Sequence, residues 1–249
     1  MKKDIKQGIS IIMPCFQEKW RVGPTLANLV DFVKRTPGLI TEVVIVDDGS
    51  TDKTLERVLT YTDKLPLTCA QHTHNQGKWM SIRTGLDIAS NDMVLILDAD
   101  GSASVHELDR LGRAYIENYV MNDKVALFGS RFLSTSSVDG KDGFRRLISV
   151  GYRYYSRALL RFATGTRAPD DLQCPFKLFP KSALRFPLES ERWSGDIELA
   201  GSLGCKILDV PIRFVHVRGS KIPKGAIFSM AWSTLVLAFS IRKRLRNLK

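Results

Sequence analysis

The chain has 249 residues, of which 44% are hydrophobic, so it is long enough for one large α/β domain with an ordinary core. Its formal net charge of +11 favours an anionic partner, such as a phosphorylated ligand or an acidic membrane face. Helix-turn-helix, zinc-spacing and RNA-binding aromatic motifs are absent from the sequence, so we expect no nucleic-acid partner. The four cysteines lack metal-ligand or redox spacing and are expected to be reduced. The first residues lead into a strand instead of a signal-peptide core, which favours the cytosol.

Apolar runs and helical spacings alternate along the first half of the chain. Strands are expected at 8–14, 42–47, 66–71, 93–97 and 125–128, and helices at 24–35, from 50–52 onward, at 78–89 and at 104–119. Such alternation predicts βαβ units, a parallel sheet and right-handed crossovers. The less regular second half predicts a long Arg-rich helix at 145–164, strands at 173–179 and 206–215, and a helix at 196–203.

The segment 226–241 contains sixteen mostly apolar residues and precedes the basic residues Arg242, Lys243, Arg244, Arg246 and Lys249. It is shorter than the roughly 20 residues needed to span a bilayer. We therefore expect residues 226–249 to form an amphipathic or apolar helix in a membrane interface, with its basic end at the lipid headgroups. The alternative is a helix buried in the core or in an oligomer interface.

Two expected strands end in pairs of carboxylates. Asp47 and Asp48 follow one apolar run, and Asp98 and Asp100 flank Ala99 after another. Open α/β sheets bind ligands at the carboxyl ends of their strands. An Asp-x-Asp pair there can hold one divalent cation, which takes its remaining ligands from water and substrate phosphates. One such pair alone could be solvated turn residues, but two pairs favour a site.

Other polar residues are expected at the same edge of the sheet. The segment 74–78 opens a helix whose N-terminus would favour phosphate. Carboxylates can accept hydrogen bonds from a base and a ribose, and a cation can neutralise a diphosphate. The sequence contains neither a Gly-x-Gly-x-x-Gly nor a Walker lysine motif, so it predicts a nucleoside diphosphate ligand outside the usual dinucleotide and P-loop sites.

An ordered set of motifs points to one family. They are Val-Asp-Asp-Gly-Ser-Thr-Asp at 46–52, Asn-Gln-Gly-Lys at 75–78, Asp-Ala-Asp-Gly-Ser at 98–102, Gly-Ser-Arg at 129–131, Asp-Leu-Gln-Cys-Pro-Phe-Lys at 171–177, Arg-Trp-Ser-Gly-Asp-Ile-Glu-Leu at 192–199 and Gly-Ser-Lys at 219–221. Each motif is weak alone, but the ordered set is specific. The chain resembles the inverting GT-A glycosyltransferases of family 2, above all the dolichyl-phosphate β-glucosyltransferase branch, with dolichyl-phosphate mannose synthase as a cousin.

The resemblance implies a Rossmann-like α/β fold, with a mostly parallel central sheet flanked by helices, as the catalytic domain at 1–225. It implies inverting transfer of a hexose, glucose first, from a nucleotide sugar such as UDP-glucose to dolichyl or polyprenyl phosphate. The enzyme would use Mg²⁺ or Mn²⁺ and work at the cytoplasmic face of a membrane as a peripheral protein. Alternatives are GDP-mannose as donor, a non-lipid acceptor with a homo-oligomer built on the terminal helix, or a non-catalytic nucleotide-sugar or nucleic-acid binding protein.

The resemblance also implies roles for single residues. Asp100 would be the main metal ligand, helped by Asp98, and would form the catalytic set with Asp171 and Asp196, which shape or polarise the reaction site; the alternative role of these two is that of a general base. The remaining implied sets are Pro14, Phe16, Glu18 and Asp48 for the nucleoside, Lys78, Asp98 and Ala99 for the donor diphosphate and ribose, and Arg131, Arg145 and Ser149 for the lipid phosphate.

The chain departs from the family pattern at four positions. Pro175 replaces a glycine, Trp79 replaces the glycine that follows the motif lysine, and Gln17 stands where asparagine is frequent. Gly195 replaces an aromatic residue, which we expect to widen the acceptor or sugar pocket.

Overall fold

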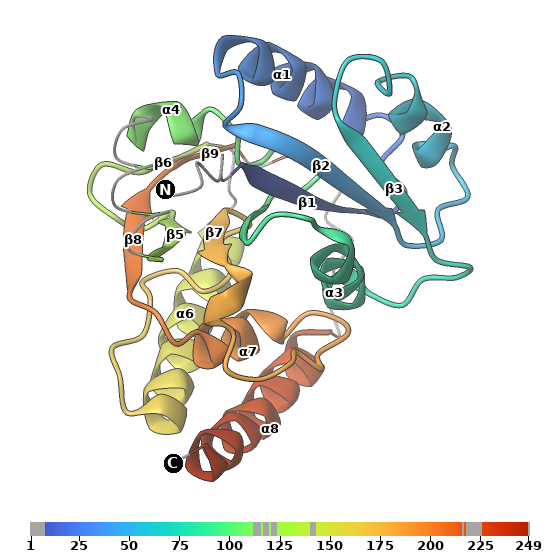
Figure 1. Cartoon of the computed structure of the whole chain (residues 1–249). Helices are drawn as coiled ribbons and strands as arrows, with labels where there is room; N and C mark the ends of the chain where they lie inside the picture. Colours follow the sequence, from blue (N-terminus) through green and yellow to red (C-terminus); the bar gives the residue numbers. More distant parts are fainter. Residues whose placement is uncertain are drawn as a thin grey trace.

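The computed structural model describes residues 8–111, 116, 120, 124–139, 143–215, 217 and 226–248, without the side chains of 139, 143–147 and 226–227. Within this part of the chain, one sheet has seven strands (Figure 1). They are β1 (Ile9–Cys15), β2 (Ile40–Asp47), β3 (Leu67–Gln71), β4 (Met93–Ile96), β5 (Ala126–Ser130), β7 (Lys177–Pro180) and β8 (Ile207–Pro211). Their spatial order is β3-β2-β1-β4-β7-β5-β8.

The sheet is parallel except at β7. Strand β1 pairs in parallel with β2 and β4, and β5 pairs in parallel with β8. Strand β7 lies antiparallel between β4 and β5. The first residue of β7 therefore lies at the edge where β4 and β5 end. The mostly parallel sheet is confirmed, whereas the strand expected at 173–179 begins only at Lys177.

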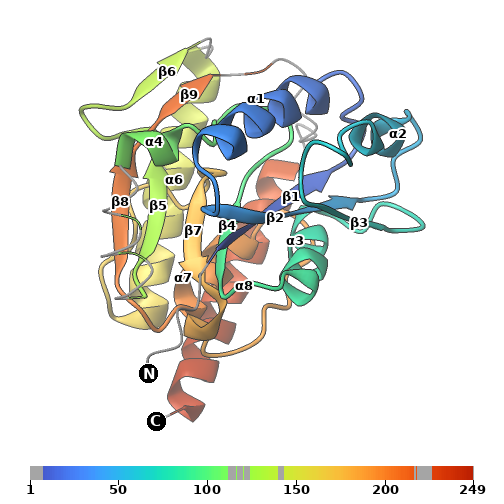
Figure 2. The same ribbon diagram turned by 45° about the horizontal axis from the view of Figure 1, so that its top comes forward.

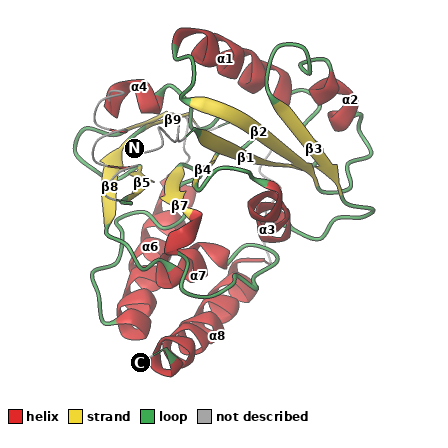
Figure 3. Cartoon of the chain, in the orientation of Figure 1, coloured by secondary structure: helices red, strands yellow, loops and turns green. Residues whose placement is uncertain are grey.

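Helices cover both faces of the sheet (Figures 1 and 3). One face carries α1 (Val22–Arg35), α2 (Thr54–Leu59) and α4 (Glu107–Leu111); the other carries α3 (Lys78–Ile88), α6 (Gly143–Thr164), α7 (Gly195–Ser202) and α8 (Ala226–Asn247). A short 3₁₀ turn, η2 (Lys181–Ala183), follows β7. Two buried clusters result, one on each face. Because both faces are covered, the central strands are apolar throughout instead of alternating.

A small second sheet departs from the expected elements. The strand expected at 206–215 is interrupted at Ile212, which donates its backbone N–H to Ser130 O over 3.3 Å. The chain then leaves the main sheet, and β9 (Arg213–Val215) pairs with β6 (Ser137–Asp139) beside the β5–β8 end of the molecule (Figure 2). The helix expected at 104–119 is described as α4; beyond it, the described Ile116 and Val120 are buried.

Helix α8 has one packed face and one exposed face. Met230, Thr234, Ala238 and Ile241 are buried at helical spacing against α6 and α7. Large apolar side chains on the opposite side are exposed, namely Phe228, Trp232, Val236 and Phe239. Among the described helices, none combines the length and apolarity needed to cross a bilayer. The terminal helix is thus confirmed as an element, and its place in a membrane interface stays a prediction.

Two arginines of α8 hold it against the rest of the protein. Arg244 donates to Oε1 of Glu198 at 3.0 Å and also pairs with Glu189. Arg242 donates to the carbonyl of Phe162, at the end of α6, at 2.8 Å. Glu198 is fully buried, so its charge needs a partner at this position. Part of each guanidinium is therefore bonded within the protein, and the expected contact of the basic residues with lipid headgroups stays a prediction.

We expect Arg244→Leu to lower the free energy of unfolding by about 3 kcal/mol, because it leaves Glu198 buried without its cation. Urea denaturation of the full chain measures this change. The exposed neighbour Lys243 provides the control, since Lys243→Leu should change stability by less than about 0.5 kcal/mol. Equal effects of the two substitutions would show that the Arg244–Glu198 pair does not anchor α8.

Candidate active site

The loop after β1 is attached to the turn after β2. The backbone N–H of Gln17 donates to Ser50 Oγ at 2.9 Å, and that of Glu18 donates to Thr54 Oγ1 at 2.7 Å. Lys19 N–H reaches Asp52 Oδ2 at 3.2 Å. The Ser-Thr-Asp part of the motif at 46–52 therefore positions the segment that carries three predicted nucleoside residues, Pro14, Phe16 and Glu18. Their contacts with a nucleoside stay a prediction.

Asp48 organises the loop before α3. Its buried carboxylate accepts hydrogen bonds from Asn75 Nδ2 at 2.8 Å and from the backbone N–H groups of Gln76 and Gly77 at 2.9 and 2.8 Å. The ring atom Nδ1 of His72 lies 2.7 Å from Asp48 Oδ1. A carboxylate has about four acceptor positions. The predicted contact of Asp48 with a nucleoside would have to share oxygens that the protein already uses.

The N-terminus of α3 does not provide the expected phosphate site. The N–H groups of Gln76 and Gly77 are bonded to Asp48, and those of Trp79 and Met80 are directed at the carbonyls of Arg192 and Glu191. A phosphate at a helix N-terminus needs such amides free. This expectation was wrong because residues distant in the sequence cap the helix, which a local pattern does not reveal.

Lys78, at the start of α3, instead pairs with the Asp-x-Asp motif. Its Nζ lies 2.6 Å from Asp98 Oδ1, and both side chains are 26% exposed. Burial alone would lower the pKa of Lys78, but Asp98, Asp196 and Asp100 together raise it. Burial raises the pKa of Asp98. The charge of Lys78 lowers this pKa, whereas the charge of Asp100 raises it further. The pair therefore leaves a charged lysine at the edge of the sheet, beside Asp100.

Asp100 is the carboxylate of the motif that has no cation of its own. It accepts the backbone N–H of Ser102 at 2.9 Å, and the described part of the chain offers it no salt bridge. Ala99 is buried, and its carbonyl accepts from Thr25 Oγ1 at 2.9 Å. Gly101, with φ of +73°, provides the left-handed turn that follows. The turn thus fixes the backbone on both sides of Asp100.

Arg131 and Asp171 form a two-pronged ion pair next to this turn. Nε and Nη2 of Arg131 lie 2.6 and 2.9 Å from the two oxygens of Asp171, which is 3% exposed. Burial raises the pKa of Asp171, but the guanidinium outweighs it and holds the pKa below its usual range. The same pairing raises the pKa of Arg131. Both groups therefore stay ionised, and part of the Arg131 fork is already used.

Lys177 is a site residue that did not enter the predicted sets. It starts β7 at 2% exposure and donates to Asp196 Oδ1 and to the carbonyl of Cys174, each at 2.6 Å. A lysine inside an apolar strand needs a buried partner, and this signal was visible in the sequence. Burial, with Asp171, raises the pKa of the neighbouring Cys174 thiol to about 12, which fits an inert structural cysteine.

These pairs form one electrostatic cluster. Lys78 is influenced by Asp98, Asp196 and Asp100, and Lys177 influences both Asp98 and Asp171. Four carboxylates thus face three cations, namely Asp98, Asp100, Asp171 and Asp196 against Lys78, Arg131 and Lys177. The formal charge of the cluster is −1, and it rests on Asp100. The sheet edge therefore brings together six predicted residues and one that was missed.

The cluster suits a hard divalent cation with few protein ligands. Among the described residues, no group of three or more His, Cys, Asp or Glu side chains could hold a metal. Asp100 and Asp98 offer carboxylate oxygens, and a cation bound by one or two carboxylates completes its shell with water and phosphate oxygens. The donor set therefore fits Mg²⁺ or Mn²⁺ together with a diphosphate, and it does not fit a site built of protein ligands alone.

The acceptor-phosphate residues are only partly described. Ser149 lies half-buried in α6, and the side chain of Arg145, in the same helix, lies outside the described residues, as does the motif at 219–221. A small cavity of about 10 Å³ beside Asp196 is lined by Gln173, Trp193, Tyr152 and Thr234. Tyr152 Oη and Thr234 Oγ1 lie 2.6 Å apart, so α6 and α8 meet next to the cluster.

Two departures from the family pattern, Trp79 and Gly195, lie in contact and compensate for each other in volume. A Cβ atom added to Gly195 would lie 2.2 Å from Cδ2 of Trp79. The Trp79 ring, 1% exposed, thus fills the space next to position 195, where the pattern has an aromatic residue. The expected widening of the pocket by Gly195 is therefore wrong, because residue 79 supplies the missing volume. The exchange has a cost, since no described residue accepts the buried Trp79 N–H.

This reciprocity can be tested with a double-mutant cycle. We expect Trp79→Ala to destabilise the protein by about 3–5 kcal/mol through a cavity, and Gly195→Phe by about 3 kcal/mol through overpacking. The double variant should be more stable by at least about 2 kcal/mol than the sum of the two single losses in unfolding free energy implies, as measured by denaturant unfolding. Gly195→Phe combined with Val58→Ala, in the core of the opposite face, is the control and should be additive. Additivity in both cycles would contradict the exchange.

Comparisons with known proteins identify the family of this chain. The model of the family "Glycosyl transferase family 2" matches residues 10–180. A dolichyl-phosphate beta-glucosyltransferase of Saccharomyces cerevisiae is 31% identical over 86% of this chain and 69% of its own length. One from Trichomonas vaginalis is 27% identical over 96% of this chain and 73% of its own length.

A solved structure shows the same fold. Glucosyl-3-phosphoglycerate synthase from Mycobacterium tuberculosis, in complex with Mn²⁺, uridine diphosphate and glucosyl-3-phosphoglycerate, superposes with a TM-score of 0.65. The match covers 95% of this chain and 80% of that one at 15% identity. The expected GT-A architecture is confirmed, and with it the enzyme class that the ordered motifs predicted: the chain belongs to glycosyl transferase family 2 and is a glycosyltransferase.

Proposed function

We propose that this protein transfers glucose from a nucleotide sugar, UDP-glucose first, to dolichyl or polyprenyl phosphate with inversion at the anomeric carbon. The observation that carries the proposal is the cluster at the sheet edge, in which Asp100 alone keeps an unpaired charge for a metal and a diphosphate. Relatives that match most of this chain are dolichyl-phosphate beta-glucosyltransferases, which supports glucose and the lipid phosphate.

The acceptor can act as a nucleophile without a strong general base. The second pKa of a phosphate monoester is about 6, so one of its oxygens is already anionic near neutral pH. Asp171 and Asp196 are each held in an ion pair at 2.6 Å, with Arg131 and Lys177, and the guanidinium of Arg131 holds the pKa of Asp171 below its usual range. We infer that both carboxylates position Arg131 and Lys177 and do not accept the proton of the acceptor.

The acceptor phosphate would bind beside these cations. A guanidinium has five N–H donors, and Asp171 engages two nitrogens of Arg131. The remaining donors can contact a phosphate oxygen, as the family resemblance implies for Arg131, Arg145 and Ser149. Trp193 and Tyr152 line the small cavity beside Asp196, so the acceptor phosphate would bind on this side of the cluster.

A divalent ion, Mg²⁺ or Mn²⁺, would be held by Asp100 with help from Asp98. When bound, it would stabilise the charge of the departing nucleoside diphosphate. The M. tuberculosis synthase of the same fold binds Mn²⁺ together with uridine diphosphate, which supports a metal and a uridine nucleotide here. Lys78 would share this task, because its ammonium group lies beside both aspartates.

A single assay tests the reaction and the metal. The full chain, incubated with polyprenyl phosphate and a panel of nucleotide sugars, should form a β-linked glucosyl lipid phosphate from UDP-glucose. Asp100→Asn should reduce the rate by about 100-fold or more, because the charge that holds the cation is lost. Asp87→Asn, an exposed position on α3, should leave the rate unchanged.

The outcomes separate the alternatives. A lipid product formed only from GDP-mannose would show that the transferred sugar is mannose. A product formed only with a soluble acceptor would show that the acceptor is not a lipid phosphate. Nucleotide-sugar binding without any product would indicate a binding protein. Activity that persists in EDTA and in Asp100→Asn would contradict the metal role.

We also propose that the exposed face of α8 lies in a membrane interface on the cytoplasmic side, next to the acceptor site. Phe228 and Trp232 are 85% and 68% exposed on the turns adjoining Met230 and Thr234, whose own partners are Ser194 and Tyr152 beside the cluster. Exposed aromatic side chains on an amphipathic helix suit the headgroup boundary.

Phe228→Ser with Trp232→Ser should weaken binding to vesicles of neutral phosphatidylcholine by about tenfold or more, because two large apolar groups no longer insert. Turnover of a long-chain acceptor should fall with it, while nucleotide binding persists. Leu59→Ser, at an apolar position on α2 that is 51% exposed, is the control and should bind vesicles normally. Unchanged vesicle binding together with a shift of oligomeric state would instead identify this face as a subunit interface.

A further inference from the structure

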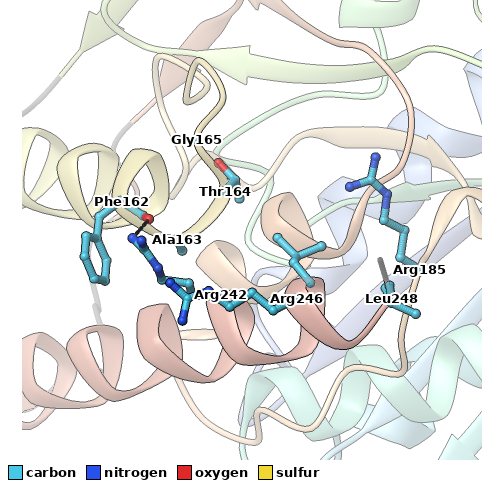
Figure 4. A pocket seen from close by; sticks show the side chains of 9 residues that line it. Phe162, Ala163, Thr164, Gly165, Arg185, Arg242, Arg246 and Leu248 are labelled. Carbon is cyan, nitrogen blue, oxygen red and sulfur yellow. Dashed lines mark hydrogen bonds between the residues drawn. The ribbon is translucent and has the colours of Figure 1, made fainter.

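A pocket of about 510 Å³ lies between the C-terminal ends of α6 and α8, away from the acceptor cavity (Figure 4). Thr234 and Arg246 are separated by about 18 Å along α8 at 1.5 Å per residue, so the pocket belongs to a different part of the surface. It is lined by residues 162–165 and by Arg185, Arg242, Leu245, Arg246 and Leu248. No role described above uses this pocket.

Three arginines from two segments line the pocket: Arg185 follows η2, and Arg242 and Arg246 lie about one turn apart on α8; its lining residues include no carboxylate. The described part of the chain gives neither Arg185 nor Arg246 an ion pair, and both side chains are exposed. The C-terminal ends of two helices would each contribute about half a negative charge. The three guanidinium groups outweigh this, so the pocket carries a net positive charge of about two and favours an anion.

Arg242 is held in a defined geometry. Its Nη1 donates to the carbonyl of Phe162 at 2.8 Å, as drawn in Figure 4, and its guanidinium lies 4.4 Å from the Phe162 ring centre. One edge of this arginine is thus fixed at the end of α6. A planar guanidinium fixed in this way suits a phosphate oxygen better than a mobile lysine does.

The rim of the pocket is apolar. Phe162 and Phe239 stack edge-to-face with ring centres 5.2 Å apart, and they are 43% and 56% exposed. Phe239 also belongs to the exposed face of α8, so the apolar surface continues from the acceptor end of that helix to the pocket. Positive charge beside an exposed apolar strip matches an amphiphile with an anionic head better than it matches free phosphate or a nucleic acid.

We propose that this pocket binds the phosphate group of an anionic phospholipid headgroup and so forms a second membrane contact, separate from the acceptor site. The phosphate would lie against Arg185, Arg242 and Arg246, with the acyl chains along Phe162 and Phe239. Together with the aromatic residues near the start of α8, this contact would fix the orientation of the helix on the bilayer. The inference rests on the proposed membrane contact but not on the identity of sugar or acceptor.

The test compares vesicles of phosphatidylcholine alone with vesicles that also contain phosphatidylglycerol. Arg185→Gln with Arg246→Gln should reduce the affinity gained from the anionic lipid by about tenfold or more, because two cationic groups near the anionic surface are lost. Binding to neutral vesicles and turnover of a short soluble acceptor should stay unchanged. Lys34→Gln with Lys64→Gln removes the same charge from exposed positions near α1 and α2, and it should have little effect.

Each outcome decides the proposal. An equal loss in both pairs of variants would overturn it, because only the net charge would then matter. If millimolar inorganic phosphate saturates the pocket while the protein shows no preference for anionic vesicles, the lipid assignment is overturned. The Phe228→Ser/Trp232→Ser variant separates the two membrane proposals: it should bind neutral vesicles weakly yet keep its preference for anionic lipid.

Discussion

The need to pair buried charges at one edge of the sheet determines much of the arrangement around the active site. Lys177 is 2% exposed inside an apolar strand, and an unpaired ammonium there would cost several kcal/mol. Its partner, Asp196, lies in the first turn of α7, so the ion pair links the antiparallel strand to that helix. The Arg131–Asp171 fork links the end of β5 to the segment before β7 in the same way. Cation and carboxylate thus connect the strands and the helix that form the reaction site.

The sequence allowed the parallel strands and their carboxylates to be predicted because both signals are local. Continuous apolar runs identify strands covered on both faces, and Asp98 and Asp100 follow one directly. The antiparallel direction of β7 depends on where the chain returns to the sheet, which periodicity does not encode. Asp48 illustrates the same limit: its position after a strand was predictable, whereas its bonds to the loop before α3 depend on contacts 24–29 residues away.

The Trp79–Gly195 contact shows why departures from a family pattern are best considered in pairs. Each substitution alone suggested a change near the donor or a wider pocket, because the sequence shows the residue without its neighbour. The three-dimensional contact shows that the Trp79 ring fills the space next to position 195, where the family pattern has an aromatic residue. Close packing makes such compensation necessary, since a void of aromatic size would cost several kcal/mol. Substrate preference is therefore better inferred from the shape of the filled site than from either residue.

Helix α8 connects the reaction site to the outer surface of the protein. Its buried side is fixed by the Arg244–Glu198 pair and by the contact of Thr234 with Tyr152, so its exposed side cannot rotate independently. A surface rigidly attached to the cavity beside Asp196 can hold that cavity at a constant height relative to whatever the surface binds. For an acceptor whose phosphate lies at a bilayer surface, such a fixed height would reduce the loss of rotational freedom on binding. The pairing of Arg244 with the buried Glu198, with aromatic residues facing outward, is consistent with a helix that a buried ion pair holds in place and whose apolar side makes the contact.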